Sequence, residues 1–292
     1  MSGYRFSYRD PTGILWVLTD QVHCYLKRGG MKGFGVVHVQ PAVARQPYRD
    51  GVSRLGGPYT PAREMQIAME ISHDTALQWD ALNREMSRNV SAYKDSTSLG
   101  KLTIIRPDGA VRCINCWMVE WPDPVMEGPL FGTVMPIFWA ELPWFYDEVF
   151  SVQSLALPGG GLVFPITFPI TFATTSLDGY VYPDNEGDIK TWPLIRIDGP
   201  GRDPIIDNIT TGLSTTLTQT LEAGDYILID MDAATITFFD SSLGTTTSII
   251  ELMGATSTFW SLVRGSNTIR VRMSDAVSGA ITFTFPILYQ SL

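Results

Sequence analysis

The sequence is poor in cysteine, in histidine and in charge. Its 292 residues include only three cysteines, Cys24, Cys113 and Cys116. So few thiols exclude a disulfide-stapled scaffold and fit a protein that folds in a reducing cytoplasm. Charged residues make up 17% of the chain and hydrophobic residues 45%. This balance excludes intrinsic disorder, and the length favours two domains with buried cores.

The sequence also lacks a recognisable leader or membrane span. The first residues, MSGYRFSYRDPTG, have none of the apolar core of a signal peptide. The longest window without charge, Val149 to Leu177, contains Pro158, Pro165 and Pro169. Each proline lacks a backbone N–H, so this window cannot form the internally hydrogen-bonded helix that a bilayer requires. We therefore expect no membrane insertion.

Positive charge is scarce in the second half. Residues 1–150 hold 15 Lys and Arg against 16 Asp and Glu, whereas residues 151–292 hold 6 against 14. An acidic surface repels the phosphates of nucleic acids and of anionic membranes. The second half is therefore expected to be a solvated module that does not bind DNA.

No catalytic or ligand-binding motif stands out. The chain has no G-x-S-x-G and no P-loop, and Gly159–Gly161 precedes an extended run rather than a helix. Cys113 and Cys116 form a C-x-x-C, but residues three apart on a strand point to opposite faces, which disfavours zinc or redox chemistry. Three histidines lack ligand spacing: His23, His38 and His73.

Carboxylates are frequent in the second half and allow three interpretations. A glycosidase pair or a Ca²⁺ site is conceivable, but the apolar alternation around them favours strands whose turns the carboxylates cap. We therefore assign no catalytic, cofactor-binding or metal-binding residue. The carboxylates in question are Asp225, Asp230, Asp232 and Asp240.

Composition and periodicity predict a mainly β fold with one amphipathic helix. The expected strands of the first half include Ile14–Val22, Gly33–Val39, Arg63–Ile71 and Gly132–Glu148, with a hairpin turn at 107–109. A helix is expected over Asp74–Tyr93, with one apolar stripe. The stripe consists of Trp79, Leu82, Met86, Val90 and Tyr93.

One long loop and one repeat interrupt this pattern. The loop Pro41–Arg63 is either an arm that reaches a neighbouring subunit or a mobile surface loop. The repeat FPITFPITF (164–172) is extended because each phenylalanine that precedes a proline avoids helix. We interpret it as an interdomain joint, part of which can serve as an edge strand. Cleavage near Gly159–Gly161 is expected to leave two folded fragments.

The second half predicts an antiparallel sandwich. Its short alternating runs are separated by turn residues at the spacing typical of such folds. Aromatic residues in a sandwich usually belong to the core, but on its surface they offer a platform for a carbohydrate. The aromatic residues in question are Tyr180, Tyr182, Trp192 and Trp260.

The order of these segments resembles the siphophage distal tail protein family, of the type found in phages of Gram-positive and actinobacterial hosts. In the first half the resemblance rests on PAREMQIAMEI, the helix, GKLTIIRPDGAVRCI and GTVMPIFWAELPWFYDE. The joint GLVFPITFPITF resembles the linker of minor tail proteins. In the second half the matching segments are NEGDIKTWPLIRIDGP, PIIDNITTG, LEAGDYILID and STFWSLVRGSNTIRV.

The resemblance implies a structural virion protein without enzymatic activity. Residues 1–157 would be a ring-forming β-sandwich or split-barrel domain, residues 158–172 a linker, and residues 173–292 a galectin-like sandwich. Made in the host cytoplasm, six copies would form a ring at the tail tip between the tail-tube, tape-measure and hub proteins, and DNA would pass through the lumen. The alternatives are a carbohydrate-binding adhesion protein that acts through the second sandwich and, less favoured, a tail-tip enzyme.

Overall fold

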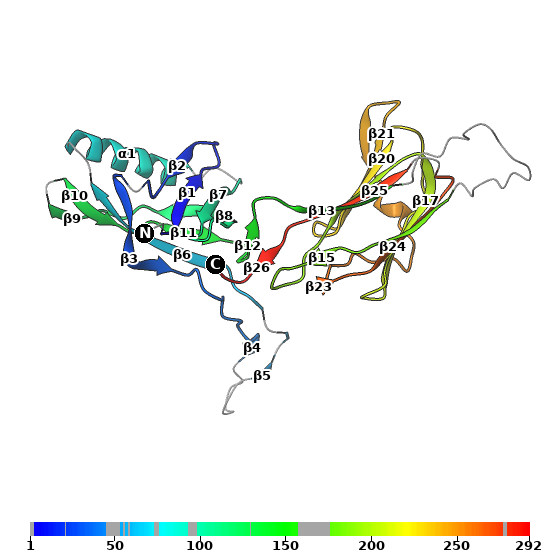
Figure 1. Ribbon diagram of the computed structural model, residues 1–292, viewed down its shortest axis with the longest axis horizontal. Coiled ribbons are helices and arrows are strands. Elements are labelled where there is room, and N and C mark those ends of the chain that lie inside the picture. Colours follow the sequence, from blue (N-terminus) through cyan, green and yellow to red (C-terminus); the bar gives the residue numbers. More distant parts are fainter. Residues whose placement is uncertain are drawn as a thin grey trace, which may run out of the picture. The chain divides into compact units, whose positions relative to one another are not determined.

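The computed structural model describes residues 3–292 except 21, 45–52, 55, 58, 73–75, 93–97, 129, 157–175 and 277–278 (Figure 1). Within these residues the chain is mainly β, with antiparallel sheets and one α-helix, which confirms the predicted fold class. The chain folds into two compact units. Unit 1 comprises Met1–Glu148 and Tyr289–Leu292, and unit 2 comprises Val149–Leu288.

Unit 1 is built on one large sheet. Its strands follow the order β2-β1-β7-β8-β11-β6-β10-β9, while β3 pairs with β6 and β12 with β8 outside that order. The elements of unit 1 are β1 (Arg5–Arg9), β2 (Leu15–Val17), β3 (Cys24–Lys32), β4 (Val43–Ala44), β5 (Ser53–Arg54), β6 (Arg63–Ser72), α1 (Ala76–Ala92), β7 (Gly100–Ile105), β8 (Val111–Glu120), β9 (Val125–Gly128), β10 (Phe131–Val134), β11 (Ile137–Ala140) and β12 (Phe145–Asp147).

The core of unit 1 follows from strand alternation. In β6 every second side chain is buried, and the predicted strand is confirmed. Its buried residues join those of β1, β7, β8 and β11 in a single cluster. The hairpin between β7 and β8 is also as predicted, because Gly109 has a φ of +88° and donates to the Arg106 carbonyl oxygen at 2.9 Å.

Helix α1 covers part of this core through two residues of the expected stripe, Leu82 and Met86. Met86 is buried, and Leu82 packs against the same cluster. Asn83 accepts a hydrogen bond from the indole nitrogen of Trp121 at 3.1 Å, which links the helix to the segment after β8. The side chains of Trp79 and Val90, and Tyr93 as a whole, lie outside the described part of the chain.

Three expected strands of unit 1 require correction. Residues 33–39 form no strand, because Gly33 has a φ of +80° and a Cβ there would collide with the Glu64 carbonyl. Among the described residues of Ile14–Val22, only Leu15–Val17 forms a strand. The run Gly132–Glu148 is divided into β10, β11 and β12, with Pro136 and Pro143 in the gaps.

Unit 2 has two principal sheets, with strand orders β13-β25-β16-β20-β21-β22 and β14-β24-β17-β18. β19 pairs with β17, and β15 with β23. The elements are β13 (Ser151–Ala156), β14 (Leu177–Val181), β15 (Asp184–Asn185), β16 (Leu194–Asp198), β17 (Gly201–Asn208), β18 (Leu213–Thr216), β19 (Thr220–Leu221), β20 (Tyr226–Asp230), β21 (Thr235–Asp240), β22 (Thr245–Ser248), the 3₁₀ helix η2 (Ile250–Leu252), β23 (Gly265–Ser266), β24 (Ile269–Ser274), β25 (Ala280–Phe285) and β26 (Leu288–Tyr289), whose last residue belongs to unit 1.

Both principal sheets of unit 2 bury one face in a shared core. Ile195, Ile229 and Phe283 from the first sheet lie in the same apolar cluster as Ile206 and Val271 from the second. Each of these side chains is at most 1% exposed. Because buried and exposed positions alternate along the strands, the two sheets pack as a sandwich.

The division between the units differs from the expected boundary. The predicted linker, residues 158–172, lies outside the described residues and stays a prediction. Residues 149–157 were expected in the first domain, yet β13 pairs with β25 in unit 2, from Ser151 opposite Phe285 to Ala156 opposite Ala280. The pairing joins segments far apart in sequence, so local periodicity could not indicate it.

Candidate functional site

The predicted arm is a paired excursion from the sheet of unit 1. After β3 the chain leaves the sheet and returns in β6, and the excursion carries the short β4–β5 hairpin (Figure 1). Closer to the sheet, the backbones of Gln40 and Tyr59 exchange two hydrogen bonds of 2.8 and 2.9 Å. The described parts of the loop therefore pair with each other outside the sheet, and contact with a neighbouring subunit stays a prediction.

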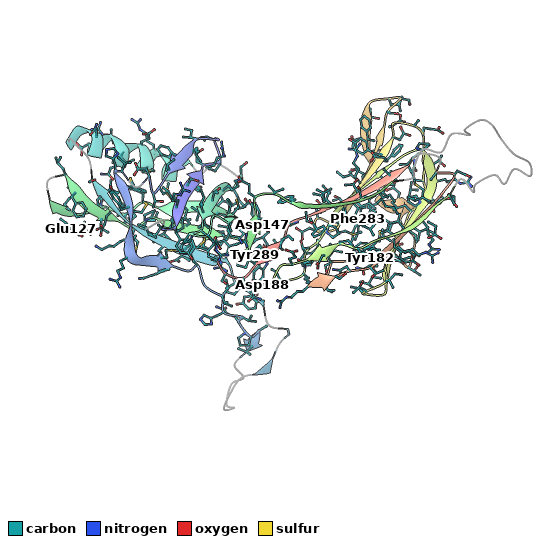
Figure 2. All side chains as sticks on the ribbon, in the orientation of Figure 1. Glu127, Asp147, Tyr182, Asp188, Phe283 and Tyr289 are labelled. Atoms are coloured by element: carbon teal, nitrogen blue, oxygen red, sulfur yellow. The ribbon has the colours of Figure 1, made fainter. Side chains whose placement is uncertain are left out.

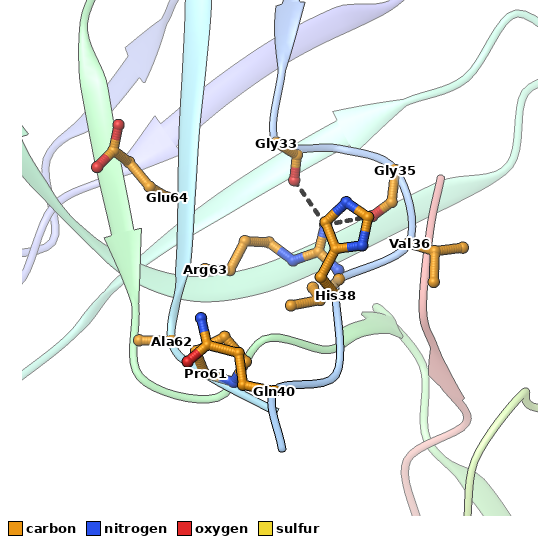
Figure 3. Close-up of a pocket in the computed structure, with 10 residues that line it drawn as sticks. Gly33, Gly35, Val36, His38, Gln40, Pro61, Ala62, Arg63 and Glu64 are labelled. Atoms are coloured by element: carbon orange, nitrogen blue, oxygen red, sulfur yellow. Dashed lines mark hydrogen bonds between the residues drawn. The ribbon is translucent and has the colours of Figure 1, made fainter. Parts of the chain in front are cut away.

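Arg63 holds the root of this arm. Its guanidinium donates from Nη1 to the carbonyl oxygens of Gly33 and Gly35, at 2.6 and 2.8 Å (Figure 3), and from Nε to that of Pro143 at 2.7 Å. Its carbon atom Cζ lies 4.6 Å from the centroid of the Phe145 ring. Burial lowers the pKa of Arg63 to about 10, so the side chain remains charged at neutral pH.

A cavity of about 460 Å³ lies at this root (Figure 3). Val36 on its wall is 63% exposed, so the cavity presents apolar surface to solvent. The wall also contains hydrogen-bonding groups of the backbone and of Gln40 and Glu64. Such a mixture of apolar and polar groups is typical of protein interfaces rather than of catalytic clefts. The lining residues are Gly33, Gly35, Val36, Val37, His38, Gln40, Pro61, Ala62, Arg63 and Glu64.

The last residues of the chain belong to the same region of unit 1. Arg63 donates from Nη2 to the carbonyl oxygen of Gln290 at 2.7 Å. The hydroxyl group of Tyr289 donates to Asp147 at 2.9 Å (Figure 2), and the Arg112 guanidinium stacks on the Tyr289 ring at 3.8 Å. Arg112 also forms an ion pair with Asp147. Residues 289–292 are thus an integral part of unit 1.

Two of the edge strands in the large sheet of unit 1 carry exposed apolar side chains. β2 and β9 stand at the two ends of the strand order. Leu15 and Val17 on β2, and Val125 and Met126 on β9, are all exposed. An edge strand presents unpaired backbone groups, and proteins that avoid association usually protect such an edge with charge. These two edges are therefore suited to contact with further chains.

The three cysteines are free thiols, of which Cys113 and Cys116 are buried and Cys24 is half-buried. Cys116 lies in the core of unit 1, whereas Cys113 is buried beside Thr103, with Sγ 3.8 Å from Oγ1. Burial raises the pKa of both thiols, and it raises that of Cys24 to about 11, so all three are protonated at neutral pH. Among the described residues, no group of three or more His, Cys, Asp or Glu side chains is arranged to hold a metal ion.

The structure describes the surroundings of two of the three histidines. His23 lies 3.6 Å from Asp20, His38 lines the cavity at the arm root, and His73 lies outside the described residues.

No helix of the described part of the chain is long and apolar enough to cross a membrane.

Three of the four carboxylates singled out in unit 2 cap turns, as predicted. Asp225 accepts hydrogen bonds from the Ser241 hydroxyl and backbone and from the Glu222 backbone. Asp230 accepts from the backbone of Asp232, which follows it in the turn. Asp240 accepts from Ser242 and Leu243 in the same way. Each of these three carboxylates therefore uses at least one oxygen to hold a turn.

The four aromatic residues singled out in the second half fall into two groups. Trp260 is buried in the core of unit 2, and Trp192 packs against that core. Tyr180 and Tyr182, in contrast, are exposed and stack on each other, with ring centroids 6.5 Å apart and an interplanar angle of 16°. The general expectation that such residues are core residues is therefore right for the tryptophans and wrong for the tyrosines.

Sequence reasoning missed two features of unit 1. Arg63 shares its face of β6 with Met65 and Ile67, so a charged residue in phase with buried apolar ones was a visible signal for the buried guanidinium. The edge β9 gave no signal, because VMEG lacks a clear alternation. Which strands lie at the edges depends on the pairing of the whole sheet.

The chain is similar in sequence and in structure to components of phage tails. Residues 186–286 match the family model described as the C-terminal domain of a siphovirus-type tail component. No curated protein matches the sequence. The structure is similar to the crystal structure of the Dit protein of phage SPP1, with a TM-score of 0.63 and 13% identity over 96% of this chain and 98% of that one.

A second similar structure is that of the phage p2 baseplate in its activated conformation with calcium. It has a TM-score of 0.50 and 10% identity over 96% of this chain and 97% of that one. The family and the fold are those of structural tail and baseplate proteins, not of enzymes. Residues 186–286 thus match the siphovirus-type tail component family, and the whole chain has the fold of the SPP1 Dit protein.

Proposed function

We propose that this structural tail component forms a hexameric ring at the distal end of a phage tail. The observation that carries the proposal is the pair of open, apolar edges, β2 and β9, at opposite ends of the sheet of unit 1. When one edge pairs with the other edge of the next copy, the contacts run head to tail. Such contacts form a ring if the rotation from copy to copy brings the last copy back to the first. The count of six rests on the resemblance to distal tail proteins.

The arm supports the same assembly. It leaves the sheet of unit 1, carries the exposed side chains of Val39, Val43 and Tyr59, and is fixed at its root by Arg63. A rooted arm with exposed apolar side chains is suited to contact with the next subunit.

The division of labour is part of the proposal. Unit 1 (Met1–Glu148 with Tyr289–Leu292) forms the ring, and unit 2 (Val149–Leu288) forms a galectin-like sandwich that projects outward. The ring joins the tail-tube protein and the tape-measure protein to the tail-tip hub protein, and helps in host attachment and DNA passage. The near-neutral charge of the first half and the acidic second half keep DNA from adhering to the lumen.

The mass of the purified full-length chain tests this proposal. Six copies of 32.4 kDa correspond to about 194 kDa, measurable by native mass spectrometry, and negative-stain images should show six-fold rings. A stable ring should be populated at a protein concentration of about tens of micromolar. A monomer or a closed dimer at that concentration would contradict the ring.

A second candidate function is carbohydrate binding by the C-terminal sandwich at the tail tip. The specific observation in its favour is the exposed stack of Tyr180 and Tyr182. Aromatic pairs are normally buried or hydrogen-bonded, and an exposed pair marks a surface that gains energy from a partner. Binding of the full-length protein to a glycan array would distinguish adhesion from a purely structural role.

A further inference from the structure

One face of the β14–β24–β17 sheet carries an ordered set of aromatic and charged side chains. In the strand register Tyr180 lies opposite Arg270, and Arg270 lies opposite Asp207. Asp178 lies opposite Arg272 in the next row. The alternate positions of these strands, such as Val181 and Val271, are buried in the core. The set therefore occupies the outer face of the sheet, and we call it the tyrosine–arginine face.

The aromatic part of this face is flat and open. Tyr180 is 48% exposed and Tyr182, which follows β14 (Figure 2), is 60% exposed. Their rings stack nearly parallel, and the Arg270 guanidinium lies 5.9 Å from the Tyr180 centroid. Neither hydroxyl group forms a hydrogen bond with another described residue. Two parallel rings with free hydroxyl groups offer an apolar platform with a polar rim.

The charged part of the face is balanced and organised by two ion pairs. Arg270 holds both carboxylate oxygens of Asp178, at 2.9 and 2.8 Å, and Arg272 holds one oxygen of Asp207 at 2.5 Å. Two guanidinium groups thus face two carboxylates, and the net charge is zero. Exposed ion pairs contribute little to stability, so folding alone gives no strong reason for this arrangement.

Hydrogen-bonding capacity on this face is not used up. The Nε atom of Arg272 is buried and has no hydrogen-bond partner in the described structure. The second carboxylate oxygen of Asp207 likewise has none there. Because this nitrogen is shielded from solvent, a ligand on the face would accept from the outer guanidinium nitrogens rather than from Nε. The face therefore offers both donors and acceptors beside an aromatic platform.

We propose that the tyrosine–arginine face binds a neutral sugar residue of a host-surface glycan. The C–H face of a pyranose packs on the tyrosine rings. Two adjacent hydroxyl groups of the sugar form hydrogen bonds with a guanidinium and a carboxylate, in the bidentate geometry that these charged groups favour. The zero net charge favours a neutral glycan over a phosphate-rich polymer. This inference deepens the second candidate function and does not require the ring.

The test is glycan binding by the full-length protein and matched variants. The probes are immobilised neutral glycans (built from hexoses, N-acetylhexosamines and deoxyhexoses) and, separately, a poly(glycerol phosphate). Binding of at least one neutral glycan is expected, with a loss of about tenfold or more in affinity for Tyr180→Ala/Tyr182→Ala and for Asp207→Asn. Tyr25→Ala, at an exposed tyrosine of unit 1, is the control and should bind as the parent does.

Several results would overturn the inference. These are no binding of any neutral glycan by the parent at millimolar concentration, equal binding by the parent and the Tyr180/Tyr182 double variant, or binding of the phosphate polymer alone. Capture of a protein by this face in place of a glycan would also refute it. The mass of the same samples separates the two proposals, because a ring without glycan binding refutes only this inference, and glycan binding by a monomer refutes only the ring.

Discussion

Arg63 donates a hydrogen bond to the carbonyl oxygen of Gln290, 2.7 Å away and 227 positions later in the chain. The same guanidinium holds the carbonyls of Gly33, Gly35 and Pro143. One side chain therefore connects the root of the arm, the segment before β12 and the C-terminal residues of the chain. The shape of the arm root depends on this buried charge.

Replacement of this residue should destabilise unit 1. Arg63→Met keeps the length of the side chain but leaves four carbonyl oxygens without their donor, and each buried group left unsatisfied costs about 1–3 kcal/mol. We expect a loss of about 3 kcal/mol or more in the free energy of unfolding, measured by denaturant titration. Arg28→Met, at an exposed position of β3, is the control. An Arg63→Met variant as stable as its parent would show that the guanidinium network is dispensable.

A chain cut near Gly159–Gly161 should remain one particle. The sequence predicts cleavage there and two separate folded fragments, but β13 lies before the cut and pairs with β25 after it. Residues 289–292 also belong to unit 1 although they follow the cut. We expect the two fragments to co-elute in native size-exclusion chromatography and to separate only in denaturant.

A pair of variants sharpens this test. Leu155 packs against the core of unit 2, so Leu155→Asp places a charge at a half-buried apolar site and should weaken the association of the fragments. Gln153→Asp, at an exposed position of the same strand, should leave it unchanged. Fragments of the unmutated protein that separate in native buffer would mean that β13 does not hold them together.

Charge on the open edges should block assembly without unfolding the chain. Val17→Lys on β2 and Val125→Lys on β9 replace exposed side chains, so the free energy of unfolding should change by only about 0.5 kcal/mol. A lysine on an edge strand opposes pairing with another chain, so the mass should fall toward that of a monomer. Leu243→Lys, at an exposed position of unit 2, should assemble normally. Full assembly by both edge variants would place the ring contacts elsewhere.

Acid should reveal the contribution of Asp225. Burial alone would raise the pKa of this carboxyl group, but hydrogen bonds from Ser241 and Glu222 outweigh it and lower the pKa below the usual 3.8. A lowered folded-state pKa means that the stabilisation is present above the unfolded value and is lost as the pH falls through the folded one. Asp225→Asn should therefore cost about 1–3 kcal/mol at pH 7 and much less at about pH 2.

Thermal unfolding of the parent and the variant at both pH values measures this difference. Asp232→Asn, in an exposed turn, serves as the control and should cost little at either pH. An equal cost of Asp225→Asn at both pH values would mean that the ionised carboxylate is not the stabilising form.

Local patterns were enough to predict much of the fold. The alternation in REMQIAMEI, the turn residues at 107–109 and the stripe around Met86 correspond to β6, the β7–β8 hairpin and the buried face of α1. Each of these features depends on residues a few positions apart in the chain. Over that range the periodicity of side chains is a direct consequence of backbone geometry. The capping role of Asp225 and Asp240 followed from turn chemistry in the same way.

The sequence by itself determined the mainly β class, the helix and the absence of a catalytic motif, because these follow from composition and short-range periodicity. Only the tertiary structure decided that β13 pairs with β25, that β2 and β9 are edge strands, that Arg63 reaches Gln290, and that Tyr180 and Tyr182 face solvent while Trp260 does not. Each of these depends on which strands are neighbours. Strand pairing joins residues far apart in the chain and depends on the packing of the whole core, which no local window of the sequence contains.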